Sequence, residues 1–226
     1  MNERSAYYSF GGALQRQSRV VVAIMLRDIR TRFFGHGLGF LLAIAWPLAH
    51  ILILLGIYGA TGRAAPYGDS SALFFATGLA PFMAFQYMSR FVMYSVIFNK
   101  PLLSFPAVKI IDLLFARVIL EGLGACCMVI VLAAVLTVAG IDVTPRDPVE
   151  AALALAAALL LGAGYGISNG LICMVLPTWA TGYTLLIILM YIFSGVLFVP
   201  DALPESLRPL VAINPPLHLV EWMRSA

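Results

Sequence analysis

The stretch from residue 151 to residue 200 contains no Asp, Glu, Lys or Arg, and this absence constrains the fold more than any other feature of the sequence. A charged side chain at the centre of a bilayer costs about 2.5–3.5 kcal/mol on insertion scales, so an uncharged apolar run of about 20 residues marks a membrane span. This run of 50 residues is too long for one helix across about 30 Å of hydrocarbon. It therefore predicts two spans, separated by a break at residues 177–182.

The composition argues against a typical water-soluble domain. Hydrophobic residues make up 62% of the chain and charged residues only 11%, whereas a soluble domain normally carries about 25% charged residues. The net charge of +3 is too small, and the basic residues are too interrupted by apolar ones, to indicate a nucleic-acid partner. We therefore predict an all-α integral membrane protein.

Apolar runs elsewhere predict further spans at residues 37–58, 72–98 and 110–139, which gives five in total. Before them, residues 14–34 mix arginines with apolar residues and predict an amphipathic helix that lies along the membrane interface. After the fifth span, residues 199–216 carry five prolines among apolar residues and predict short helices that dip into the interface. We divide the chain into an interfacial segment, 1–35, and a transmembrane domain, 36–226.

Lys and Arg are distributed unevenly between the two sides of this topology. Nine lie on the N-terminal side, namely Arg4, Arg16, Arg19, Arg27, Arg30, Arg32, Lys100, Lys109 and Arg117. Three lie on the opposite side, namely Arg63, Arg146 and Arg208. Because cytoplasmic loops carry an excess of Lys and Arg, this count predicts a multi-pass protein with a cytoplasmic N-terminus.

The sequence contains no pattern that indicates an enzyme or a bound cofactor. The cysteines, Cys126, Cys127 and Cys173, lie inside predicted spans without zinc-ligand spacing, and the three histidines lack neighbouring carboxylates. No Gly-x-x-x-x-Gly-Lys-Ser/Thr motif occurs, so the chain cannot bind ATP in the P-loop manner. If transport is driven by ATP, a separate subunit must bind ATP and Mg²⁺.

Two patterns inside the spans predict helix contacts. Gly162, Gly166 and Gly170 repeat at four-residue intervals, which lets another helix approach closely. We favour packing within the protomer over an oligomer or gating contact. Arg90 and Glu121 lie at similar depths on consecutive spans, and because buried ions usually pair, we predict that they form an ion pair.

Aromatic residues form a stripe along one face of the second predicted span. They are Tyr87, Phe91, Tyr94 and Phe98. Such a stripe can offer a stacking track to sugar rings, but interfacial aromatic belts and ordinary packing produce the same pattern. Both interpretations stay open at this point.

Three collinear blocks resemble the permeases of ABC-2 type polysaccharide exporters, and the second and third resemble their capsular polysaccharide branch. The first block is Arg27-Asp28-Ile29-Arg30-Thr31-Arg32-Phe33 with Gly35, Leu38-Gly39-Phe40-Leu41 and Pro47. The second is Asn99, Leu102-Leu103, Phe105-Pro106, Val108-Lys109, Ile111-Asp112, Ala116-Arg117 and Leu120-Glu121. The third is Phe193-Ser194-Gly195 through Pro200, Pro204, Asn214-Pro215, His218 and Glu221.

The resemblance implies a half-transporter in which two permeases form the passage and two ATPase subunits bind beneath. It implies an ATPase-coupling segment that comprises Asn99, Lys100, Phe105, Pro106, Lys109 and Asp112. It also implies an entrance helix with Arg27, Arg30 and Arg32, and an exit gate with Pro200, Pro204, Asn214 and Pro215. Members of the family continue through a sixth span, so a chain that ends at residue 226 is expected to be shortened.

The function that we expect is export of lipid-linked capsular polysaccharide across the bacterial inner membrane to the periplasm. The implied partners are a second copy of the chain, the ATPase, membrane lipid, and periplasmic and outer-membrane export components. Three alternatives stay open. They are an ABC-2 exporter of another glycan such as O-antigen or teichoic acid, or of a small drug; an ion-coupled secondary transporter, against which the absence of internal repeats speaks; and a scaffold without transport activity.

Overall fold

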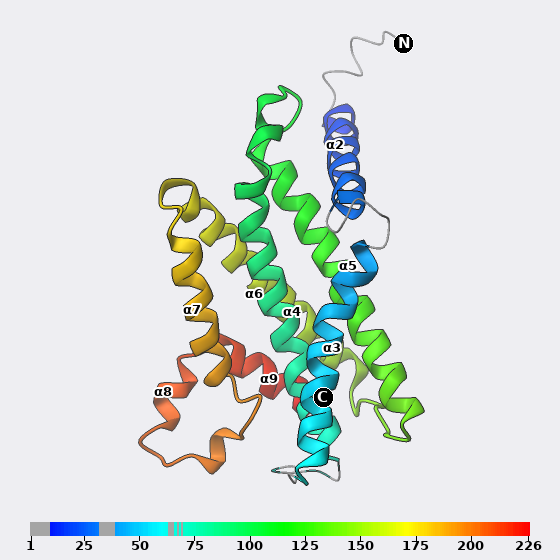
Figure 1. Cartoon of the computed structure of the whole chain (residues 1–226), viewed down its shortest axis with the longest axis vertical. Helices are drawn as coiled ribbons and strands as arrows, with labels where there is room; N and C mark the ends of the chain where they lie inside the picture. Colours follow the sequence, from blue (N-terminus) through cyan, green and yellow to red (C-terminus); the bar gives the residue numbers. More distant parts are fainter. Residues whose placement is uncertain (1–9, 32–38, 63–65, 67, 69) are drawn as a thin grey trace.

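The computed structural model describes residues 10–31, 39–62, 66, 68 and 70–226, and the described part of the chain is built from helices without strands. Figure 1 shows these helices as an elongated bundle. The long helices are α2 (Phe10–Thr31), α3 (Gly39–Ala60), α4 (Ser71–Phe98), α5 (Ile110–Val138), α6 (Pro148–Val175) and α7 (Trp179–Ile192). The short ones are η1 (Lys100–Ser104), η2 (Pro200–Ala202), α8 (Arg208–Ala212) and α9 (Pro215–Ser225).

The prediction of an all-α protein with several apolar spans is confirmed. Among the described residues, three helices are long and apolar enough to cross a membrane: α3, α5 and α6. Helix α7 is apolar but only 14 residues long. Helix α4 has the length, at 28 residues, but is not among the three. The count of five spans therefore stays a prediction.

Local sequence signals explain where several of these helices begin and end. The Asp147 carboxylate accepts hydrogen bonds from the backbone N–H groups of Val149, at 2.9 Å, and Glu150, at 3.2 Å, which caps the N-terminus of α6. Pro148 takes the first helical position, where its missing N–H costs nothing. The uncharged run breaks between α6 and α7, around Pro177, as predicted.

Helix α4 is the most enclosed helix, and α6 packs closely along it because of the glycine repeat. A Cβ atom added to Gly162 would lie 2.7 Å from the carbonyl oxygen of Phe85. A Cβ added to Gly166 would lie 2.7 Å from the carbonyl oxygen of Ser89. Only glycine permits this approach, so the glycine repeat serves packing within the protomer, as the sequence favoured.

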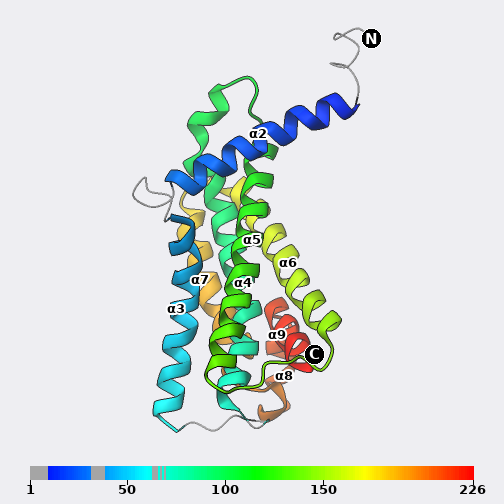
Figure 2. The same ribbon diagram turned by 90° about the vertical axis from the view of Figure 1, so that its right-hand side faces the viewer.

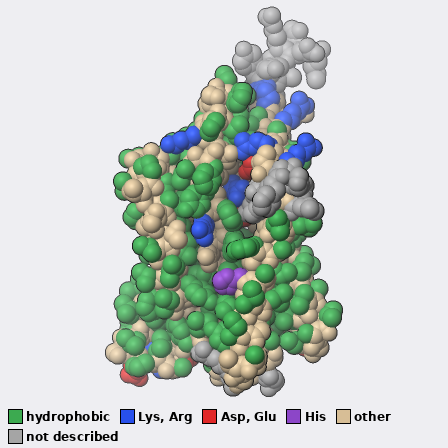
Figure 3. Space-filling view, viewed as in Figure 1, with side chains coloured by type: hydrophobic (Ala, Val, Ile, Leu, Met, Phe, Trp, Pro, Cys, Tyr) green, Lys and Arg blue, Asp and Glu red, His purple; other side chains and the backbone are tan. Residues whose placement is uncertain are grey.

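Helix α2 lies across one end of the bundle, beside the loop of residues 99–109 (Figures 1 and 2). We call this the α2 end; α8 and α9 lie toward the opposite end. The helix is amphipathic: Val21 and Ile24 are buried while Arg19 and Arg30 are exposed. On the face seen in Figure 3, Lys and Arg gather toward the α2 end and the middle is largely hydrophobic.

Candidate functional site

The α2 end is held together by an apolar cluster beneath helix α2. Val21 and Ile24 of α2 pack with Leu113 and Ala116 of α5, and all four are buried. Residues of the loop join this cluster from the side, namely Leu102, Leu103 and Val108. Burial of apolar surface therefore ties the predicted entrance helix and the predicted coupling segment to the same base.

Asp112 adds hydrogen bonds to this contact between α2 and the start of α5. Its carboxylate accepts a hydrogen bond from the backbone N–H of Lys109 at 2.9 Å and one from the side-chain amide of Gln17 at 3.1 Å. Only 3% of Asp112 is exposed. The family resemblance placed Asp112 in the segment that couples to the ATPase. In the structure, Asp112 is buried and joins the start of α5 to α2.

The exposed face of the loop carries the other residues of the predicted coupling segment. Lys100, Pro106 and Lys109 are exposed, and Phe105 leaves 59% of its surface uncovered. An exposed aromatic ring flanked by prolines and lysines is suited to contact another protein. Docking of an ATPase on this face stays a prediction.

A chain of charged side chains crosses from α2 to α5. Asp28 of α2 lies 2.5 Å from the guanidinium of Arg27 and 3.5 Å from that of Arg117, measured between the nearest nitrogen and oxygen atoms. Arg117 Nε lies 3.0 Å from Glu121 Oε1, close enough for an ion pair although not aligned as a hydrogen bond. Arg27 also donates to the side-chain oxygen of Asn99, where α4 ends. This network joins α2, α4 and α5.

The ion pair that the sequence suggested between Arg90 and Glu121 is not the one that the structure shows. Glu121 pairs with Arg117, one turn earlier on the same helix, and Arg90 is exposed. Similar depth on consecutive spans does not fix the direction of a side chain, and helix rotation directs the Arg90 side chain outward. The i,i+4 spacing of Arg117 and Glu121 was the sequence signal that could have identified the pair.

A cavity of about 380 Å³ lies beside the charged network, between α2, α4 and α5. Its walls combine charged, polar and aromatic side chains: Arg27, Asp28, Thr31, Phe91, Tyr94, Ser95, Phe98, Asn99 and Arg117. The Arg117 guanidinium sits over the Phe91 ring, with its carbon 4.9 Å from the ring centroid. The rings of Tyr94 and Phe98 stack with their centroids 5.2 Å apart. Three residues of the aromatic stripe thus meet the charged network in one cavity.

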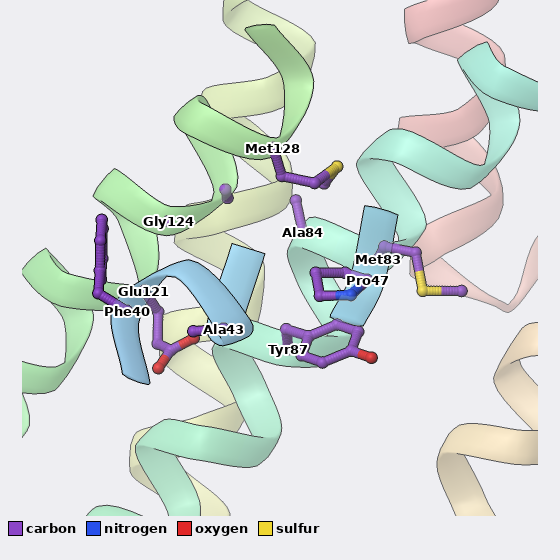
Figure 4. A pocket seen from close by; sticks show the side chains of 10 residues that line it. Phe40, Ala43, Pro47, Met83, Ala84, Tyr87, Glu121, Gly124 and Met128 are labelled. Atoms are coloured by element: carbon purple, nitrogen blue, oxygen red, sulfur yellow. The ribbon is translucent and has the colours of Figure 1, made fainter. Parts of the chain in front are cut away.

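The fourth member of the stripe, Tyr87, lies elsewhere. Its ring is 5.7 Å from that of Phe91, but it lines a separate cavity with Pro47 of α3 and Glu121 of α5 (Figure 4). That cavity has a volume of about 20 Å³, room for about one water molecule and far too little for a sugar. The stripe is therefore divided between two environments.

The predicted exit-gate residues cluster at the opposite end. Pro200 and Pro215 each open a short helix, η2 and α9, while Pro204 is exposed between η2 and α8. Asn214 donates from its side-chain amide to the carbonyl of Met190 at 2.8 Å, which fixes the start of α9 to the end of α7.

Arg224 of α9 was missed by the sequence analysis. Its guanidinium donates to the carbonyls of Gly195 at 2.7 Å and Val196 at 2.8 Å. It also lies over the Phe74 ring, 3.8 Å from the centroid. Arg224 thus holds the segment that follows α7 against α4, and nothing in the local sequence indicates those carbonyl partners.

Comparison with known proteins assigns the family. The sequence profile of the ABC-2 type transporter matches residues 19–226, which includes nearly all of the described helices. The chain belongs to the ABC-2 type transporter family. Its bundle of apolar helices is the membrane part of such a transporter, so the expectation drawn from the three sequence blocks is confirmed.

Named relatives match over nearly the whole chain. The polysialic acid transport protein KpsM of Escherichia coli is 31% identical over 210 residues, which is 93% of this chain and 81% of the relative. The capsule polysaccharide export inner-membrane protein CtrC of Neisseria meningitidis serogroup A is 27% identical over 218 residues, 96% of this chain and 82% of the relative. The protein BexB of Haemophilus influenzae, with the same description, is 25% identical over 217 residues, 96% of this chain and 82% of the relative.

Proposed function

We propose that this chain is the membrane-spanning half of an ATP-driven exporter that moves lipid-linked capsular polysaccharide from the cytoplasm to the periplasm. The observation that carries the proposal is the match to a polysialic acid transport protein over 93% of the chain and to capsule polysaccharide export inner-membrane proteins over 96% of it. The apolar helices support a multi-pass location in the inner membrane. Membership of the ABC-2 family argues against an ion-coupled secondary transporter.

In the proposed assembly, two copies of the chain form the passage and two ATPase subunits bind at the α2 end. The α2 end faces the cytoplasm, because Lys and Arg gather there and cytoplasmic segments carry that excess. ATP and Mg²⁺ bind to the ATPase subunits. Docking uses the exposed loop face that carries Lys100, Phe105, Pro106 and Lys109. Asn99 and Asp112 act indirectly, by holding this loop to α2.

The polysaccharide enters beside α2 and leaves near α8 and α9. At the entrance, Arg27 lines the cavity and Arg30 is exposed, while Arg32 lies outside the described residues. The aromatic rings of the cavity offer stacking surfaces to the glycan. At the exit, the short helices η2, α8 and α9 form the gate, held by Asn214 and Arg224. Periplasmic and outer-membrane components receive the polymer there.

Deletion of the gene in its own host tests the proposal. We expect surface capsule to disappear while lipid-linked polysaccharide accumulates inside the cell, and expression of the wild-type chain should restore the surface polymer. Other surface glycans serve as the control and should be unchanged. Normal capsule together with loss of O-antigen or teichoic acid would overturn the proposal in favour of another glycan exporter.

A further inference from the structure

We propose that one side of helix α2 binds anionic phospholipids of the membrane leaflet at the α2 end. This side consists of Arg19, Val22, Leu26 and Arg30, which follow one another at intervals of three, four and four residues. Such intervals align side chains along one stripe of a helix, and we call these four residues the α2 stripe. All four are exposed, with 51% of Val22 and 53% of Leu26 uncovered. The inference rests on the location of the chain in a membrane and not on the polymer that it exports.

The bundle covers a different side of α2. Val21 and Ile24 are buried against α5. Successive residues of an α-helix are rotated by about 100°, so Val22 and Leu26 point more than a quarter of a turn away from both. Packing within the described part of the protomer therefore does not account for these two apolar side chains.

The position of α2 beside a candidate span places the α2 stripe near the surface of the bilayer. Figures 1 and 2 show the C-terminal end of α2 beside the start of α3, and α3 is long and apolar enough to cross a membrane. A helix that lies at this surface buries its apolar side chains about 5–10 Å deep, at the boundary between headgroups and acyl chains. Its basic side chains stay among the headgroups. The α2 stripe contains both kinds of side chain.

The exposed charge of the α2 stripe is positive. Arg19 and Arg30 form no ion pair with any residue that the structure describes. The acidic side chains described at this end, Asp28, Asp112 and Glu121, are all buried. The α2 stripe therefore carries two positive charges that no described acid neutralises, and these charges are complementary to the phosphates of an anionic leaflet.

The two arginines reach separate headgroups. Arg19 and Arg30 are 11 residues apart, which is about 16 Å along the helix axis. Helical side chains tilt in the same direction, so this separation is maintained, and each guanidinium can donate two parallel N–H groups to one phosphate. Arg27 does not contribute, because it is bound to Asp28 and Asn99. The spacing fits a row of lipids rather than one bound phosphate ion.

The test places a tryptophan reporter on the α2 stripe, in the complex of the permease with its ATPase. Val22→Trp and Leu26→Trp each keep an apolar side chain at an exposed position, and the wild-type complex gives the background fluorescence. The complex is reconstituted into vesicles of equal parts phosphatidylglycerol and phosphatidylcholine, with bromine on the acyl chains of one lipid or of the other. Brominated acyl chains quench tryptophan on contact, so the ratio of the two signals gives the preference for the anionic lipid.

Both reporters should be quenched, and both should prefer phosphatidylglycerol about fivefold. An arginine near an anionic membrane surface contributes about 1 kcal/mol, which corresponds to this factor. Ala23→Trp is the matched control reporter, because Ala23 is exposed and points about 100° away from Val22, toward the arginine side of the helix. It should be quenched much less by either lipid.

Three further variants assign the preference to the arginines. Arg19→Gln in the Val22→Trp chain should lower the preference below about twofold, and Arg30→Gln should do the same in the Leu26→Trp chain. Arg146→Gln removes the same charge from an exposed position at the opposite end and should leave both preferences unchanged. Inorganic phosphate, compared with chloride at equal ionic strength, should also leave them unchanged. If one reporter chain fails to assemble, the other decides.

Absence of quenching by either lipid at both reporters would overturn the proposal, because another protein surface, such as the ATPase or a second copy, would then cover the α2 stripe. Equal quenching by the two lipids would overturn it as well, and so would equal effects of Arg19→Gln and Arg146→Gln. Quenching of Ala23→Trp as strong as that of Val22→Trp would contradict the assignment to one side of α2. Loss of the preference in phosphate alone would assign the arginines to a free phosphate ion. None of these results bears on export, which the deletion experiment measures separately.

Discussion

Replacement of Asp112 by alanine should show whether this residue stabilises the α2 end from within or contacts a docked partner. The carboxylate accepts from the Lys109 backbone at 2.9 Å and from the Gln17 amide at 3.1 Å, and 3% of the residue is exposed. A hydrogen bond to a charged group contributes about 1.5–3 kcal/mol, and loss of a helix-capping contact costs about 0.5–2 kcal/mol. Because the two bonds share one carboxylate, we expect Asp112→Ala to lower the free energy of unfolding by about 2–4 kcal/mol.

Two matched variants make this test specific. Asp112→Asn keeps an oxygen that can accept from the Lys109 backbone and should lose about half as much. Lys109→Ala removes an exposed side chain but leaves its backbone N–H in place, so stability should change by less than about 0.5 kcal/mol. Thermal unfolding in detergent, followed by circular dichroism, measures all three. In the assembled transporter, Lys109→Ala should reduce export while ATP hydrolysis continues. Equal stability of Asp112→Ala and Lys109→Ala would refute the assignment.

The remaining predictions concern the bundle core and the charged network. Gly166→Leu should destabilise the protein by about 1–3 kcal/mol or more, because its Cβ would lie 2.6 Å from the Val92 side chain; Gly164→Leu on the same helix meets nothing within 4 Å and should be tolerated. A thermal-unfolding comparison of the two decides this. A double-mutant cycle of Arg117→Met with Glu121→Met should give a coupling energy of about 0.5–3 kcal/mol. A cycle of Arg90→Met with Glu121→Met should give a coupling energy of nearly zero. A larger coupling energy for Arg90 than for Arg117 would instead support the ion pair between Arg90 and Glu121 that the sequence suggested.

The helices could be predicted because the bilayer acts on each segment independently. An uncharged run has to be helical inside hydrocarbon whatever its neighbours are, so α3, α6 and the break before α7 follow from local composition. The glycine repeat was informative for a similar reason, since close approach depends on the absence of side chains at Gly162 and Gly166. These signals are local, so they can be recognised in the sequence without knowledge of the tertiary contacts.

The candidate site could be predicted only in part. Arg27, Phe91 and Asn99 were each singled out, but their meeting in one cavity depends on the rotation of α4 and on the path of α2 across it. Spacing along the chain fixes neither. The contact between Arg117 and Asp28 spans 89 residues, and the role of Asp112 depends on Gln17, which no local pattern connects to it. Asp112 and Arg224, whose roles the sequence did not indicate, have partners on other elements. Glu121 is the exception, because its partner Arg117 lies one turn away on the same helix.

Transport into inverted inner-membrane vesicles tests the central claim most directly. Vesicles from the host, with and without this chain, are supplied with ATP and lipid-linked capsular polysaccharide, and the polymer protected from an added glycosidase is measured. We predict protection that requires both ATP and the chain. Protection that is equal without the chain, or that follows an ion gradient without ATP, would contradict an ATP-driven polysaccharide exporter.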